Sequence, residues 1–236
     1  MLSVHEGSRS LRALGAGVVV IAFAMLSSCL PVREDGLDEF DALAPRRNSA
    51  APAFELRTLD GGRLSLEQLT RDRPLVLQLG SLSCPVFRER CDNFAEFYEQ
   101  YAGRVNFAIL YTREAHPRGS PSPYADGEWI GWANHMTRVY VEEPKSVDDR
   151  AQLAAKIRET YGVPDAVPIL LDEMNNETWS RYGAAPSPVF VIDVEGRVVE
   201  RQGWGVPESL PSILDALLDR AQGAPGEGGR PVDVTK

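Results

Sequence analysis

Cys84 lies where a strand pattern gives way at once to a helix pattern. The apolar residues 75–79 are followed by Gly80 and Ser81, and Pro85, which suits the first helical turn, follows the cysteine. The free N–H groups and the positive end of a helix stabilise a thiolate. We therefore expect Cys84 to be a nucleophile with a lowered pKa in an exposed turn. A buried core cysteine is the alternative, because free cysteine is among the most buried residue types.

His116 and Glu114 follow the next apolar strand pattern, residues 105–111. His116 lies at the end of a strand beside the one that carries Cys84, and its imidazole titrates near working pH. It is therefore a candidate general acid or base. Glu114 lies on the same face of an extended segment and could orient the imidazole or relay a proton. The alternative for a lone histidine is a structural hydrogen bond.

The remaining cysteines and histidines are interpreted differently. Phe87 occupies the place of the second cysteine in a Cys-x-x-Cys pair, which excludes that disulfide chemistry. Cys91 lies on the same helix face as Cys84 but about two turns away, too far for a disulfide unless the helix start unwinds. We expect Cys91 to be a core residue, with a resolving thiol as the alternative, and His135 to lie on the surface. The scattered histidines and cysteines form no metal-binding pattern.

Between residues 53 and 220 the chain alternates strand and helix patterns. A turn at Gly61 joins two short strands into a hairpin, and apolar residues at helical spacing follow Cys84. This order predicts a three-layer α/β domain. The expected strands are residues 54–59, 63–66, 75–79, 105–111, 167–171, 189–193 and 197–201, and the expected helices are residues 87–101, 147–161, 179–182 and 210–218.

Composition limits the size of the fold and the kind of partner. At 236 residues with 43% hydrophobic side chains, the chain can bury one sizeable core and should form one domain with appendages. Its formal net charge of -9 and its pI near 5.0 argue against nucleic acid as a partner, because phosphate binding relies on clustered Lys and Arg.

The first residues follow the pattern of a secretion signal. Arg9 and Arg12 precede an apolar run over residues 14–26, which is too short to span a membrane, and the sequence Leu-Ser-Ser-Cys ends at Cys29. This tetrapeptide resembles the lipobox of bacterial lipoproteins. We therefore expect a signal peptide over residues 1–28 and lipidation of Cys29. An ordinary signal peptide with a chance cysteine is the alternative.

Lipidation would anchor the protein to the bacterial cell envelope, with its domain outside the cytoplasm. The residue after Cys29 favours the outer membrane where the cell has two membranes. Residues 29–52 are acidic and rich in Ala and Pro, and residues 221–236 are rich in Gly and Pro. We expect a flexible tether and a disordered tail, respectively, on either side of a domain over residues 53–220.

Four segments stand in order over residues 55–218: Gly80-Ser81-Leu82-Ser83-Cys84-Pro85, Tyr111-Thr112-Arg113-Glu114-Ala115-His116, Leu171-Asp172-Glu173-Met174-Asn175 and Tyr182-Gly183-Ala184-Ala185-Pro186. Together they resemble the iodothyronine deiodinases and their bacterial relatives, with cysteine where that family has selenocysteine. The order of elements also resembles the thioredoxin-fold redoxins. The resemblance implies a thioredoxin-like α/β fold with a central mixed sheet flanked by helices.

The resemblance further implies a thiol oxidoreductase that removes halogen from an iodothyronine-like aromatic, with Cys84 as nucleophile assisted by His116 and Glu114. Its partners would be a small-molecule substrate and an external thiol reductant, with no bound cofactor. Since a thiol is a weaker nucleophile and leaving group than a selenol, deiodination should be slower and more dependent on added thiol. The family's histidine before its Asp-Arg pair is missing from residues 143–150, and the loop over residues 117–140 is longer than in the vertebrate enzymes.

Two other functions compete with this one. A one-cysteine thiol peroxidase, with peroxide as substrate, is the runner-up enzyme, because Ser81 resembles the Ser or Thr three places before the peroxiredoxin cysteine. Leu77, however, stands where the peroxiredoxin motif has proline. A non-catalytic redoxin-like binding module is the third interpretation, with Trp129, Trp132 and Trp204 as candidate walls of an aromatic cleft.

Pro186 precedes a strand at the place where thioredoxin-like folds carry a cis-proline that faces the reactive thiol. We expect a cis bond there, a feature rare enough to be informative. An ordinary loop proline is the alternative, and Pro188 could equally hold the cis position. A homodimer is compatible with the sequence.

Overall fold

The computed structural model describes residues 35–92, 94–205 and 209–223. The predicted signal peptide over residues 1–28, the predicted lipidation site Cys29 and residues 224–236 of the predicted tail lie outside the described residues. Within the described ranges, no helix has the length and apolar character needed to cross a membrane.

A mixed seven-stranded sheet lies at the centre of the domain, in the order β2-β1-β5-β4-β3-β6-β7. Its strands are β1 (Glu55–Thr58), β2 (Arg63–Ser65), β3 (Leu75–Gly80), β4 (Asn106–Tyr111), β5 (Ile169–Leu171), β6 (Val189–Ile192) and β7 (Val198–Gln202). β3, β4 and β5 run parallel, whereas the remaining pairs are antiparallel. Every strand expected from the sequence is present, with ends shifted by at most two residues.

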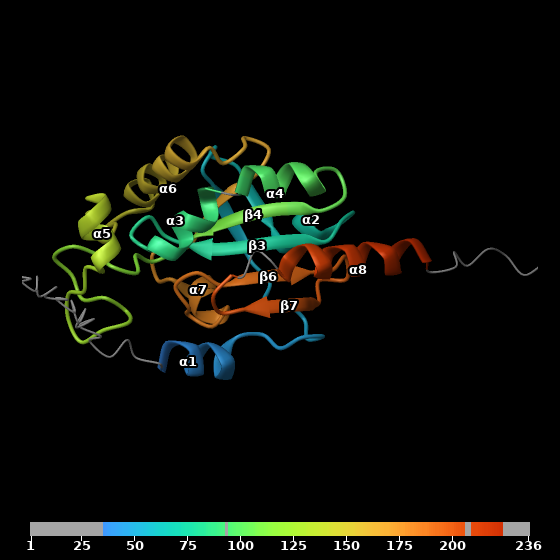
Figure 1. Ribbon diagram of the computed structural model, residues 1–236, viewed down its shortest axis with the longest axis horizontal. Coiled ribbons are helices and arrows are strands. Elements are labelled where there is room, and N and C mark those ends of the chain that lie inside the picture. Colours follow the sequence, from blue (N-terminus) through green and yellow to red (C-terminus); the bar gives the residue numbers. More distant parts are fainter. Residues whose placement is uncertain (1–34, 93, 206–208, 224–236) are drawn as a thin grey trace, which may run out of the picture. The chain divides into compact units, whose positions relative to one another are not determined.

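Helices cover both faces of this sheet. They are α1 (Asp35–Leu43), α2 (Leu66–Thr70), α3 (Pro85–Asp92), α4 (Phe94–Tyr101), α5 (Trp132–Thr137), α6 (Val147–Tyr161), α7 (Glu177–Arg181) and α8 (Leu210–Gly223). Figure 1 shows α3, α4 and α6 on one side of the strands, and α1 and α7 on the other. The prediction of a three-layer α/β domain with a central mixed sheet is confirmed.

Alternate residues of β3 supply the two hydrophobic cores, because successive strand side chains point to opposite faces. Val76 packs in the cluster that includes α3, α4, α6 and α8. Leu75, Leu77 and Leu79 pack in the other cluster, with α1, α2 and the residue after α7. All six residues of β3 are buried, as expected for a central strand covered on both faces.

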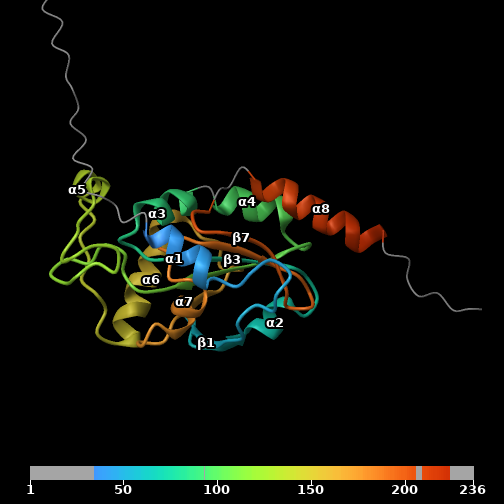
Figure 2. The same ribbon diagram turned by 90° about the horizontal axis from the view of Figure 1, so that it is seen from below.

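The carboxyl ends of β3 and β4 lie level, and this positions the candidate site. Gly80 pairs with Tyr111 in parallel register, so the loops that follow the two strands start side by side. A Cβ at Gly80 would lie 2.1 Å from the Phe87 ring, so only glycine allows α3 to pack this closely over the strand end. Figure 1 and Figure 2 both place α5 near the α3 end of the domain.

The prediction of a flexible tether over residues 29–52 is wrong for its described part. Residues 35–43 form α1, and Phe40 is 2% exposed with its ring centroid 6.0 Å from that of Phe190. Ala50 then pairs with Arg197 beside β7. Sequence patterning did not reveal this packing, because half of the residues around Phe40 in α1 are acidic, a composition that predicts a tether.

Two smaller differences concern helices. α8 continues to Gly223, past the predicted domain end at residue 220. Residues 132–137 were expected to be part of a loop rich in Gly, Pro and Trp, but they form α5, whose exposure is the reverse of that of an amphipathic core helix. Trp132 and Met136 are 76% and 64% exposed, while the polar Asn134 is fully buried.

Replacement of Phe40 by alanine tests whether α1 belongs to the folded domain. We expect Phe40→Ala to lower the free energy of unfolding by about 3 kcal/mol, through lost burial and the cavity left behind. Leu43→Ala on the same helix is the matched control, because Leu43 is 57% exposed and should change stability little. Chemical denaturation measures both, and equal effects of the two variants would contradict the packing of α1.

Candidate active site

The reactive turn, residues 81–84, connects β3 to α3 and holds Cys84 directly before the helix. The N–H of Cys84 donates to Ser81 O at 3.0 Å, and the N–H of Phe87 donates to Cys84 Sγ at 3.5 Å. The predicted position at a strand-to-helix turn is therefore present. The predicted exposure is wrong, since Cys84 is only 1% exposed.

Glu114 is a fully buried carboxyl group that binds the reactive turn. The backbone N–H of Ser83 donates to Glu114 Oε2 at 2.8 Å, and the Tyr111 hydroxyl donates to Glu114 Oε1. Tyr111 also accepts the N–H of Leu82 at 3.0 Å. Burial raises the pKa of Glu114, and the hydrogen bonds from Ser83, Tyr111 and Ser81 oppose that rise.

Two serine hydroxyls join the reactive turn to the loop after β4. Ser81 Oγ accepts the backbone N–H of Ala115 at 3.1 Å, and Ser83 Oγ accepts the backbone N–H of His116 at 2.9 Å. The structure thus brings Cys84, Glu114 and His116 to one edge of the sheet, as the sequence analysis expected.

The His116 ring is held in one orientation. Its Nδ1 lies 3.1 Å from Trp129 O, and the Trp129 ring packs edge-on at a centroid distance of 4.4 Å. A carbonyl oxygen only accepts, so Nδ1 carries the hydrogen and the neutral ring keeps its lone pair on Nε2. Nε2 faces Gly131, where a Cβ would lie 4.0 Å away. Burial, and secondarily the positive charge of Arg88, lower the pKa of His116.

The segment over residues 117–140 covers the reactive turn from the solvent side. Asn134 of α5 donates through Nδ2 to Ser83 O at 2.8 Å and accepts from Arg88 Nη2 at 2.8 Å. The Tyr124 hydroxyl donates to Ala184 O at 3.0 Å, which ties the same segment to the turn after α7. Cys84 itself is buried in the hydrophobic cluster that includes Leu82 and Phe87, against which Tyr124 also packs.

The structure corrects the expected pKa of Cys84. Burial raises the pKa of the thiol from 9.0 to about 11, and the charge of Glu114 adds to the rise. The N–H of Phe87 and the positive charge of Arg88 act in the opposite direction but are outweighed. The helix start does stabilise the thiolate, yet removing the thiol from water costs more.

Cys91 lies on α3 with no exposed surface, and both cysteines are free thiols. Burial raises the pKa of Cys91, and the neighbouring charges of Asp92 and ionised Cys84 add to the rise. The expectation of a core residue agrees with this burial. A resolving role for Cys91 stays a prediction, because it needs the start of α3 to unwind.

The predicted cis bond at Pro186 is wrong, because the described residues contain no cis peptide. The chain turns instead through Gly183 and Ala184, whose φ angles are +89° and +52°. The Trp179 indole N–H donates to Ala185 O at 3.1 Å and so supports the residue before the proline. The alternative of an ordinary loop proline therefore fits Pro186.

Asp172 and Arg150 hold the turn that leads into α7. The Asp172 carboxylate accepts the N–H groups of Thr178 at 3.2 Å and Trp179 at 2.9 Å. The fully buried Arg150 donates to Asp172 O at 2.7 Å. Asp172 and Arg150 therefore stabilise the segment between β5 and α7. Among the described residues, neither forms a hydrogen bond with the reactive turn.

Glu143 adds a second carboxylate behind Glu114. Its Oε2 accepts the backbone N–H of Glu114 at 3.1 Å, and its Oε1 lies 3.9 Å from Arg150 Nη2. Burial and the charge of Glu114 raise the pKa of Glu143. Glu143 comes from the stretch that lacks the family's histidine.

Four residues of this site have no role assigned from the sequence: Tyr111, which stands there only as part of a family motif, Arg88, Asn134 and Glu143. Two of them carry a usable signal. Tyr111 stands three residues before Glu114, and Arg88 stands one helical turn after Cys84. Asn134 and Glu143 come from segments with a loop-like sequence, where no regular spacing connects them to Cys84 or Glu114.

The three tryptophans expected to form a cleft lie in different surroundings, and His135 lies on the surface. Trp129 packs against His116, whereas Trp132 is 76% exposed and does not wall a cleft. Trp204 pairs with Ser187 through a backbone bridge. His135 is exposed and lies 3.2 Å from the Tyr140 hydroxyl, as expected for a surface histidine.

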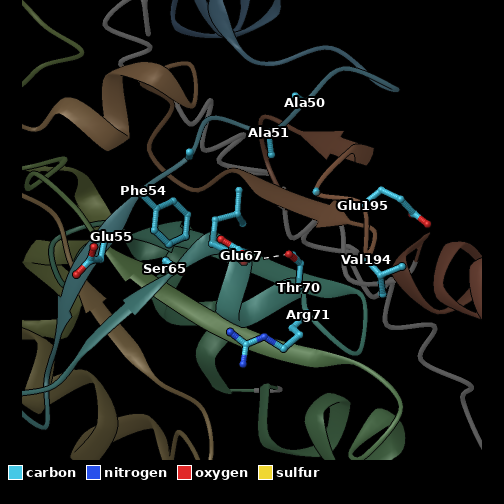
Figure 3. A pocket seen from close by; sticks show the side chains of 13 residues that line it. Ala50, Ala51, Phe54, Glu55, Ser65, Glu67, Thr70, Arg71, Val194 and Glu195 are labelled. Atoms are coloured by element: carbon cyan, nitrogen blue, oxygen red, sulfur yellow. Dashed lines mark hydrogen bonds between the residues drawn. The ribbon is translucent and has the colours of Figure 1, made fainter.

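A groove of about 840 Å³ lies elsewhere in the domain. Figure 3 shows Phe54 and Thr70 lining it, with Val194 and Glu195 of the turn between β6 and β7 across from them. No residue of the reactive turn or of the loop after β4 lines this groove. It is therefore separate from the candidate active site.

The family of this chain follows from its similarity to known proteins. A model of the iodothyronine deiodinase family matches residues 37–221. The chain belongs to this family. The match includes the reactive turn, Glu114 and His116, and it begins within α1, so that it includes Phe40.

Curated deiodinases are similar to this chain over part of their length. The thyroxine 5-deiodinase of Gallus gallus is 31% identical over 149 residues, which cover 62% of this chain and 52% of the relative. The Homo sapiens thyroxine 5-deiodinase is 31% identical over 144 residues, 60% of this chain and 43% of the relative. The chain thus spans about half the length of the curated deiodinases it matches.

Solved structures support the thioredoxin-like fold. A Chlorobium tepidum chain, provisionally described as a thiol:disulfide interchange protein, superposes with a TM-score of 0.52 at 16% identity, covering 74% of this chain and 99% of that chain. At this identity the likeness concerns the fold alone. The deiodinase-family domain therefore has the redoxin architecture expected from the order of its elements.

Titration of Cys84 tests the effect of its burial. We expect site-resolved alkylation, read by mass spectrometry, to give an apparent thiol pKa of about 11. Because the folded pKa lies above the unfolded one, the thiol stabilises the fold below pH 9, and this contribution of about 2 to 3 kcal/mol should be lost as the pH rises to about 11. Cys84→Ala supplies the reference for unfolding, and an apparent pKa below 9 contradicts the buried thiol.

Proposed function

We propose that the protein catalyses thiol-dependent reductive removal of iodine from an iodothyronine-like aromatic, with Cys84 in place of selenocysteine. One observation carries this proposal. In a chain of the deiodinase family, the turn that carries the Cys84 thiol is hydrogen-bonded to the loop that carries Glu114 and His116, through the Ser83 N–H to the Glu114 carboxyl group and through two serine hydroxyls to the backbone N–H groups of Ala115 and His116.

The proposed reaction balances with an external thiol as reductant. The Cys84 thiolate takes iodine from the aromatic carbon, and a proton replaces the iodine on that carbon. The resulting sulfenyl iodide reacts with one thiol to give a mixed disulfide and iodide, and a second thiol releases Cys84 and a disulfide. Overall, one aryl iodide and two thiols give the deiodinated aromatic, hydrogen iodide and one disulfide.

Glu114 and His116 have distinct roles in this proposal. The neutral His116 keeps a lone pair on Nε2 and can accept a proton or a hydrogen bond from the substrate. Burial raises the pKa of Glu114, so its protonated form persists to higher pH than that of a free carboxyl group and can deliver a proton at the reactive turn, whereas its ionised form opposes ionisation of Cys84. Since the thiol is buried, the segment over residues 117–140 must move before an aromatic ring reaches Cys84.

Iodide release from thyroxine tests this proposal. We expect the purified full chain to release iodide under excess dithiol, and Cys84→Ser to abolish the release. His116→Ala should lower the rate about 100-fold through lost proton transfer. His135→Ala is the matched control, because it removes an exposed histidine and should leave the rate unchanged.

Peroxide consumption, followed in parallel, separates the competing functions. Cys84-dependent consumption of peroxide without iodide release would move the protein to the thiol peroxidases. If the folded protein neither releases iodide nor consumes peroxide, both enzymatic functions are contradicted and a redoxin-like binding module is favoured.

We also propose that Cys29 is acylated and anchors the domain to a bacterial membrane, on the strength of the sequence pattern before it. Mass spectrometry of the membrane fraction should find an N-terminus that begins with acylated Cys29. Cys29→Ser should leave the membrane fraction free of this peptide. An unmodified N-terminus or a retained signal in the wild-type protein would overturn the proposal.

A further inference from the structure

Arg88 is a buried cation without an acidic partner among the described residues. It is 5% exposed, yet none of the ion pairs of the described residues includes it. Its three side-chain hydrogen bonds go to neutral acceptors, namely Leu82 O at 2.7 Å, Asn134 Oδ1 at 2.8 Å and Thr137 Oγ1 at 3.3 Å. A buried charge is costly unless a group of opposite charge compensates it.

The side chain of Arg88 turns back toward the start of α3. Its backbone N–H donates to Cys84 O at 3.1 Å, one helical turn earlier, and its guanidinium reaches the carbonyl of Leu82. The cation therefore lies against the backbone of the reactive turn two residues before Cys84, while its own backbone is bonded to that of Cys84. Asn134 fixes it there and at the same time binds Ser83 O.

The other titratable groups that act on Cys84 are not positive. Glu114 faces the turn from the loop after β4 and opposes ionisation of the thiol. Tyr124 and Cys91 are neutral at ordinary pH, because burial raises the pKa of each. His116, in the same loop as Glu114, has a lowered pKa and is neutral as well. Among the described groups that act on Cys84, Arg88 is thus the positively charged one.

We propose that Arg88 is the counter-charge of the Cys84 thiolate, and that Asn134 of α5 positions it for this role. The proposal rests on Cys84 being the reactive thiol of the proposed function. It explains why a guanidinium is buried beside the turn with neutral partners alone. The missing negative charge is the one that forms on Cys84 when it ionises.

The pH dependence of Cys84 alkylation tests this role without any substrate. The midpoint of the alkylation profile is compared among full-chain variants, since the midpoint reports ionisation while the absolute rate also reports access. Arg88→Gln removes the charge and keeps a donor for Leu82 O, and it should raise the midpoint by about one unit or more, a tenfold loss of thiolate. Arg90→Gln removes the same charge from the same helix and should leave the midpoint unchanged.

Arg88→Lys separates charge from structure. Lysine keeps the charge but not the forked donor geometry, so a counter-ion role predicts a midpoint close to that of the wild type. The proposal is overturned if Arg88→Gln shifts the midpoint no more than Arg90→Gln. If Arg88→Gln does not fold, Arg88→Lys still tests the proposal. A folded Arg88→Lys protein whose alkylation midpoint lies about one pH unit above that of the wild type would overturn the counter-charge role. The alkylation assay contains no thyroxine. Its result therefore does not depend on whether the protein removes iodine from thyroxine.

Discussion

The buried carboxyl group of Glu114 is the interaction on which the reactive turn depends. It accepts the N–H of Ser83 and the hydroxyl of Tyr111, and both donors belong to strands or turns that end at the same edge of the sheet. A carboxyl group this far from water is stable only with several donors, and the serines of the turn supply further ones. The cost of burying Glu114 therefore fixes the geometry of the turn that carries Cys84.

The same constraint explains why the thiol is positioned but not strongly acidic. Side chains bind each backbone group around the sulfur: Tyr111 and Glu114 take the N–H groups of residues 82 and 83, while Arg88 and Asn134 donate to their carbonyls. This enclosure orders the site before a substrate arrives, and it also removes water from the sulfur. Ionisation then depends on the few charges inside the enclosure, a negative one from Glu114 and a positive one from Arg88.

Much of the fold could be predicted, since the central strands are apolar runs, the turn at Gly61 marks the hairpin of β1 and β2, and α6 was predicted with its bounds as observed. The convergence of Cys84, Glu114 and His116 could also be predicted, because parallel neighbours end at the same edge. The pKa of Cys84 could not, since it depends on burial in a cluster assembled from several segments of the chain. Packing of α1 through Phe40 depends on its contact with Phe190, far away in the sequence, which local patterns do not encode.

Hydrogen exchange of the Ser83 amide tests the central role of Glu114 most directly. The account predicts strong protection of this amide in the wild-type protein, comparable to that of the β6 amides in the core. In Glu114→Ala, the Ser83 amide should exchange much faster while the β6 amides keep their protection, because only the turn loses its acceptor. Unchanged protection of Ser83 in a folded Glu114→Ala protein would contradict the claim that this carboxyl group holds the reactive turn.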